Sequence, residues 1–141
     1  MIKKKPVKVI ICGSRTFDDF NFLEEKICYI FHDLKEKGIL YGTPNGDREI
    51  IEIISGGADG ADIWGEWFAS LYGLKCKVFP ADWEHKGKQA GIIRNHEMVN
   101  YITSQDCVGL IIAFWDGESK GTQDCFNYGH KNGLDTHIIL F

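Results

Sequence analysis

The chain has 141 residues, 44% of them hydrophobic and 13% aromatic, which suits one domain with a single packed core. Its formal net charge of −4 argues against a general nucleic-acid surface, which normally carries a basic excess. Because apolar runs fall short of the ~20 residues of a membrane span and the five scattered cysteines show no zinc-ligand spacing, we expect a cytoplasmic protein without membrane contact, cofactor or metal.

Short apolar runs alternate along the chain with segments whose apolar residues recur at helical spacing. Strands are expected at residues 7–12, 50–54, 76–79, 108–115 and 136–141, and helices between them at 20–37, 60–72, 90–103 and 121–132. This alternation predicts an α/β, Rossmann-like fold in which one domain, residues 1–141, forms an open, mainly parallel five-stranded sheet with helices on both faces. Trp64, Trp67 and Phe68 are expected on the buried stripe of their helix.

Polar loops containing glycine follow three of the predicted strands. Gly13 and Ser14 follow the first strand, residues 55–62 (SGGADGAD) follow the second, and residues 116–122 (DGESKGT) follow the fourth. Ligands of open α/β sheets bind beyond the carboxyl ends of the strands, so these loops predict a ligand site at one edge. The turn-rich segment 39–49 is expected at the opposite edge, and we assign it no chemistry.

Several familiar motifs are missing. The first strand is not followed by GxGxxG and the second does not end in an acidic residue, which disfavours an ordinary NAD-dependent dehydrogenase. The GxxxxGK[ST] motif of P-loop proteins and the GxSxG motif of α/β-hydrolases are also absent from the sequence.

Five segments, in this order, resemble the YspA-like branch of the SLOG superfamily: GSR, SGGADGAD, FPADW, AGIIRNHEM and GTQD, at residues 13–15, 55–62, 79–83, 90–98 and 121–124. The resemblance covers nearly the whole chain. It implies a Rossmann-like fold that binds nucleotides or nucleotide-derived signals. Relatives in this superfamily include the Lonely Guy phosphoribohydrolases and the DNA-processing protein DprA.

The start of the helix near Gly121 is the predicted phosphate site. Ser119, Lys120, Gly121 and Thr122 would surround the anion with N–H, hydroxyl and ammonium donors. The position corresponds to the phosphate-holding glycine–threonine loop of Lonely Guy enzymes. The alternative is an ordinary capped helix start.

Arg15 and Arg94 are the predicted clamp for the same anion, because guanidinium groups match phosphate oxygens. The alternative for either side chain is an ordinary surface cation. The segment that starts at Arg94 and Asn95 also resembles the helix that supplies a catalytic arginine in Lonely Guy enzymes.

The loop at residues 55–62 is predicted to meet the sugar or base, since its carboxylates would repel a phosphate. Gly56 and Gly57 would allow close backbone approach, and Asp59 or Asp62 would bind ribose hydroxyls or transfer a proton. Capping of the helix by Asp59, with Asp62 solvated, is an equally good interpretation. The predicted ligand site comprises Gly13, Ser14, Arg15, Ser55, Gly56, Gly57, Asp59, Asp62, Trp83, Arg94, Asn95, Ser119, Lys120, Gly121 and Thr122.

Trp83 and Trp115 lie at predicted strand ends, where an indole either stacks on a base or packs on its own sheet. The polar loop 82–91 has the composition of a mobile lid. His85 and His96 are candidate acid–base groups by their intrinsic pKa, although isolated histidines seldom catalyse.

Three classes of function stay open. The first is a nucleotide-binding sensor or sequestering module, for an ADP-ribose-like signal for example. The second is hydrolysis of the N-glycosidic bond of nucleoside 5′-monophosphates, with Arg94, Asp124 or Asp59 as catalytic groups. The glutamate of the Lonely Guy motif is replaced here by Cys125, which disfavours catalysis.

The third class is regulation of a protein partner, for which the sequence localises no surface. Lonely Guy relatives dimerise, and Trp64 and Trp67 would suit a two-fold contact. A homodimer is therefore expected.

Overall fold

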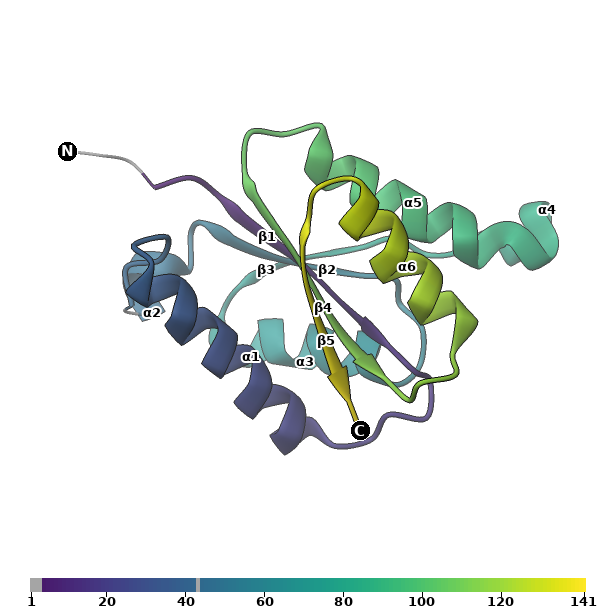
Figure 1. The fold of residues 1–141 in the computed structure, drawn as a ribbon, viewed down its shortest axis with the longest axis horizontal. Coiled ribbons are helices and arrows are strands. Elements are labelled where there is room, and N and C mark those ends of the chain that lie inside the picture. Colours follow the sequence, from purple (N-terminus) through teal and green to yellow (C-terminus); the bar gives the residue numbers. More distant parts are fainter. Residues whose placement is uncertain (1–3, 43) are drawn as a thin grey trace.

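In the computed structural model, which describes residues 4–42 and 44–141, the sheet has five strands that all run parallel, in the order β3-β2-β1-β4-β5 (Figure 1). The central strand β1 pairs in parallel with β2 on one side and with β4 on the other. The strands are β1 (Val7–Gly13), β2 (Ile51–Ser55), β3 (Lys75–Val78), β4 (Val108–Trp115) and β5 (Asp135–Leu140). The predicted α/β, Rossmann-like sheet is thus confirmed.

Helices cover both faces of this sheet (Figure 1). α1 (Phe20–Glu36) and α3 (Ala61–Tyr72) lie on one face, and α5 (Ala90–Thr103) and α6 (Lys120–Lys131) lie on the other. This arrangement follows from right-handed crossovers that run from β1 outward to β3 and then return to β4. No helix in the described part of the chain is long and apolar enough to cross a membrane.

Three short helical segments lie where the sequence predicted loops. They are α2 (Pro44–Asp47), α4 (Trp83–Lys86) and a 3-10 turn η1 (Gly87–Gln89). The polar stretch considered as a lid therefore begins with a capped helical turn, because Oδ1 of Asp82 accepts a hydrogen bond from the His85 N–H at 3.2 Å.

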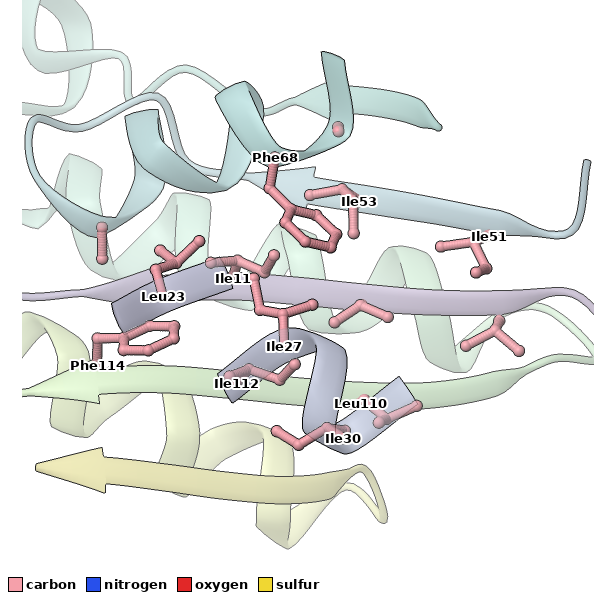
Figure 2. Packing of buried hydrophobic residues seen from close by; sticks show 14 of the residues in the cluster. Ile11, Leu23, Ile27, Ile30, Ile51, Ile53, Phe68, Leu110, Ile112 and Phe114 are labelled. Carbon is pink, nitrogen blue, oxygen red and sulfur yellow. The ribbon is translucent and has the colours of Figure 1, made fainter. Parts of the chain in front are cut away.

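The core forms two layers because successive side chains of a strand point to opposite faces. Ile11 of β1 packs toward α1 and α3, together with Leu23 and Phe68 (Figure 2). Ile10, its neighbour, packs toward α5 and α6, together with Met98. A strand that is buried on both faces needs the continuous apolar run seen in β1 and β4.

The predicted buried stripe of α3 is partly wrong. Phe68 is buried, but Trp64 is half-buried and Trp67 is 61% exposed. The buried face instead contains Gly65, whose missing side chain lets the helix approach β1 closely: a Cβ there would lie 2.8 Å from Cγ2 of Ile11. Trp67 lies outside this narrow face because each helical residue turns by about 100°.

We expect Gly65→Ala to destabilise the protein by up to about 2 kcal/mol. The added methyl overpacks the contact with Ile11, which costs about 1–3 kcal/mol, and the ~1 kcal/mol of helix propensity that alanine gains over glycine offsets part of this cost. Urea unfolding followed by tryptophan fluorescence measures the difference. Ser70→Ala, at an exposed position of the same helix, is the control and should change stability little. A Gly65→Ala variant as stable as wild type would contradict the close packing.

Candidate functional site

Two adjacent cavities open at the carboxyl edge of the sheet. The first has a volume of about 270 Å³ and lies between β1, the loop after β2, α5 and the start of α6. The second has a volume of about 390 Å³ and lies between the loop after β2 and the segment that follows β3. Both cavities are lined by Arg15, Ala58, Trp83 and Arg94. The loops that the sequence assigned to a ligand edge therefore meet.

A glycine allows the loops after β1 and β2 to touch. Gly60 precedes α3 with a φ of 81°, in the left-handed region that favours glycine. A Cβ at this position would lie 2.7 Å from the carbonyl carbon of Arg15. The first cavity is bounded on one side by these two loops.

Arg94 holds three segments together at the base of the site. Its guanidinium is buried, donating from Nη1 to the carbonyl oxygen of Gly56 and from Nε to Oδ1 of Asn95 at 3.0 Å. Nδ2 of Asn95 then donates to the carbonyl oxygen of Gly121 at 3.1 Å. The loop after β2, helix α5 and the start of α6 are thereby connected through hydrogen bonds that a buried cation strengthens.

Gly56 fits between two charged groups. A Cβ at Gly56 would lie 2.7 Å from both Cζ of Arg94 and Oδ2 of Asp62. Any larger residue would therefore separate or displace the guanidinium and the carboxylate. This steric requirement explains the first glycine of the SGGADGAD segment.

Asp62 is a buried carboxyl group that lines the first cavity, and it is 4% exposed. Desolvation by burial raises the pKa of Asp62 from 3.8 to about 6, although the Arg94 guanidinium and the N–H of Ala58 favour its charged form. A carboxyl group with such a pKa can exchange a proton near neutral pH. Because the Asp62 side chain is buried, the alternative prediction of a solvated Asp62 is wrong.

The start of α6 forms another wall. The Ser119 hydroxyl accepts a hydrogen bond from the Thr122 N–H at 3.4 Å and so caps the helix. Asp116 accepts N–H bonds from Glu118 and Ser119, which lower the pKa of Asp116. These bonds fix the turn that leads into Gly121 and Thr122, both of which line the first cavity.

Arg15 and Trp83 lie where the two cavities meet. Cζ of Arg15 is 5.9 Å from the centre of the Trp83 ring, a cation–π contact. Trp83 is 50% exposed, so its indole has free surface for a ligand. Its other side packs near Gly91, where a Cβ would lie 3.3 Å from Cη2 of the indole.

Twelve of the fifteen predicted ligand residues line a cavity: Gly13, Arg15, Gly56, Gly57, Asp59, Asp62, Trp83, Arg94, Asn95, Ser119, Gly121 and Thr122. Ser14, Ser55 and Lys120 line neither cavity. The Ser14 hydroxyl accepts a hydrogen bond from the Asp116 N–H at 3.1 Å. The Ser55 hydroxyl donates to Oε2 of Glu66 at 2.6 Å. Ser14 thus connects the loops after β1 and β4, and Ser55 connects the end of β2 to α3.

Asp124 lines neither cavity. Its Oδ1 is 3.4 Å from Nε2 of His96, whose ring stacks on Tyr128 at 3.7 Å between centroids. Its Oδ2 accepts a hydrogen bond from Asn95 at 3.4 Å. Asp124 thus helps to join α5 to α6, and this carboxylate does not line the space a ligand would fill.

Local packing decides between the alternatives that were predicted for Asp59 and for Trp115. Asp59 does not cap α3, because the residue at the N-cap is Gly60 and no side chain caps this helix. The Trp115 indole donates to the carbonyl oxygen of Ser119 at 3.0 Å and packs edge-on against Phe126. Of the two tryptophans at strand ends, only Trp83 lines the cavities.

Several residues that line the two cavities were not predicted from the sequence, and most of them are apolar or small: Cys12, Ala58, Val78, Pro80, Ala81, Lys88, Gly91, Ile92 and Cys125. Cys12 and Cys125 were hard to assign because they also belong to the buried core. Their mutual hydrogen bond and burial raise the pKa of Cys12 well above its ordinary value. A protonated thiol is a poor nucleophile, so Cys12 contributes a neutral group to the wall of the first cavity.

The first cavity is lined by charged groups of both signs. Arg15, Lys88 and Arg94 contribute positive charge, and Asp62, which lies close to Arg94, contributes a carboxyl group. In the described ranges, 4–42 and 44–141, no group of three or more His, Cys, Asp or Glu side chains is placed to hold a metal ion.

The fold and the site together define a Rossmann-like α/β protein with a ligand-sized, mixed-charge cavity at the carboxyl edge of its sheet. The chain is 30% identical to the Gene 61 protein of Mycobacterium phage D29 over 132 residues, which span 90% of this chain and 91% of that protein. It therefore belongs to the same family as that Gene 61 protein. No family model matches the chain, and no solved structure matches it significantly.

The raised pKa of Asp62 makes stability depend on pH. Below about pH 4 the Asp62 carboxyl is protonated in both the folded and the unfolded protein. Between about pH 4 and pH 6 only the folded protein keeps this proton, and at higher pH both lose it. Stability should therefore fall as pH rises through this window, by at most about 3 kcal/mol. Asp62→Asn should remove this fall, as measured by urea unfolding from about pH 4 to about pH 8.

Asp59→Asn, at an exposed neighbouring position, is the matched control and should retain the pH dependence of wild type. Parallel stability curves for wild type and Asp62→Asn would show that the Asp62 pKa is not raised.

Proposed function

We propose that this protein binds a nucleotide or a nucleotide-derived ligand, such as an ADP-ribose-like signal, as a sensor or sequestering module. The observation that carries the proposal is the first cavity, where Arg15, Lys88 and Arg94 come together with the start of α6. The resemblance to the SLOG superfamily is consistent with this proposal and is itself a prediction.

The phosphate would lie against the first turn of α6. N–H groups at a helix start lack partners within the helix, and the helix dipole favours an anion there. Apart from its chain neighbours and its own helix backbone, Gly121 has no atom within 4 Å of the position of a Cβ, so no other segment fills the space beside this residue. Arg15 and Lys88 would supply the balancing charge.

The ribose would lie toward Asp62. This carboxyl group lines the same cavity as Gly121 and Thr122, and its oxygens can accept hydrogen bonds from sugar hydroxyls. The negative charge of Asp62 disfavours a phosphate at that end, so the two ends of the cavity would orient the ligand.

Binding is preferred over hydrolysis of the N-glycosidic bond. The catalytic glutamate of the Lonely Guy motif is replaced by Cys125, and the nearby Asp124 is directed to Asn95 and His96. Asp62 is the carboxyl group that lines the first cavity. An enzyme would need a carboxylate beside the sugar, and Asp62, in the first turn of α3, is the carboxyl group that this proposal places there. The preference for binding therefore rests on the loss of the glutamate of the Lonely Guy motif.

We expect Arg15→Ala to weaken binding of AMP at least about tenfold, since a charge-assisted contact to phosphate is lost. Binding of adenosine, which has no phosphate, should stay unchanged. Isothermal titration calorimetry at low salt measures both. Arg48→Ala, at an exposed position outside both cavities, is the matched control and should bind AMP like wild type. Failure of wild type to bind AMP, ADP-ribose or other nucleotides would refute the proposed function.

We also propose that two copies associate through α3. Trp67 and Leu71 are 61% and 64% exposed on this helix, and burial of apolar surface favours association. Sedimentation at micromolar concentration should show a dimer for wild type and a monomer for Trp67→Lys. Tyr29→Lys, on exposed α1 surface, should leave the dimer intact. A monomeric wild type would exclude this association.

A further inference from the structure

We propose that the second cavity binds a second, uncharged group of the same ligand, so that the site takes a nucleotide extended through its phosphate, as in nucleoside diphosphate sugars and dinucleotides. This inference rests on the proposed function, and it adds a second subsite to it. The two cavities share Arg15, Ala58, Trp83 and Arg94, so a ligand that fills both would pass this shared wall.

The size of the cavities supports a two-part ligand. Their volumes are about 270 Å³ and 390 Å³, whereas small-molecule sites commonly measure ~300–1,000 Å³. The first cavity alone lies just below this range, which suits a mononucleotide and not a ligand extended beyond it. A longer ligand would use the adjoining space as well.

The lining of the second cavity indicates the chemistry of its occupant. Val78, Pro80 and Ala81 provide an apolar wall, and Gly56 and Gly57 line the same cavity without side chains that would fill it. Asp59 adds a carboxylate, which accepts hydrogen bonds from hydroxyl or amino groups and repels an anion. A sugar or base fits these features better than a second phosphate.

The wall that the two cavities share is suited to an anionic linker between the two parts of the ligand. The Arg15 guanidinium lies over the Trp83 ring and lines both cavities. A diphosphate that passes from one cavity to the other would meet this cation while the indole offers a flat surface to a neighbouring group. Arg15 would then contact the linker between the two uncharged ends.

Binding of AMP and ADP-ribose to wild type and to variants of each cavity tests the inference by isothermal titration calorimetry. Wild type should bind ADP-ribose at least about tenfold more tightly than AMP. Ala81→Trp should fill the second cavity and reduce the affinity for ADP-ribose to that for AMP, while the affinity for AMP stays within about twofold. Val78→Trp, at an exposed position of the edge strand β3, should act in the same way without disturbing the core.

Ile92→Trp is the matched variant of the first cavity, since Ile92 lines only that cavity, and it should weaken both ligands. Thermal unfolding verifies that each variant is folded. Equal affinity of wild type for AMP and ADP-ribose, or the same loss for both ligands in Ala81→Trp and Val78→Trp, would overturn the second subsite while leaving nucleotide binding in place. Absence of binding to both ligands by wild type would overturn the proposed function and this inference together.

Discussion

The parallel pairing of β1 with β2 on one side and β4 on the other is the constraint from which the candidate site follows. Parallel strands end at the same edge of a sheet, so the loops after β1, β2 and β4 are brought together there. Ser14 then joins two of these loops, because its hydroxyl accepts the Asp116 N–H and its own N–H donates to Phe114. The backbone that borders the first cavity is therefore fixed by the sheet itself.

Arg94 also holds the segments around the site together, from a helix and not from the sheet. It lies on α5, the helix that returns the chain from β3 to β4, and its hydrogen bonds reach the loop after β2 directly and α6 through Asn95. Burial of a guanidinium costs free energy unless its N–H donors are satisfied. Loss of the hydrogen bond to Gly56 or to Asn95 would therefore release both the loop after β2 and the start of α6. Arg94 thus has a structural role that is independent of any ligand. A Lys at this position would lack the second donor direction.

The edge of the sheet was predictable from the sequence because strand periodicity and glycine-containing loops are local signals. Gly13 ends β1, Gly56 follows β2 and Gly121 lies in the first turn of α6, and all three line a cavity. The role of Ser55 was not predictable, since its partner Glu66 lies on the next helix. Asp124 and Asp62 are a second case that the sequence could not decide. Both are acidic residues near helix starts, yet only Asp62 lines the first cavity.

The sequence by itself determined the order of strands and helices, the two-sided burial of β1 and β4, and the edge at which polar loops gather. These features depend on apolar periodicity and turn residues, which act over a few neighbouring positions. Only the tertiary structure decided that Trp67 is exposed, that the buried Cys12 thiol has a raised pKa, and that the site has two cavities that share Arg15 and Trp83. Those properties depend on which surfaces the crossovers bring into contact, and side-chain burial and pKa follow from that contact.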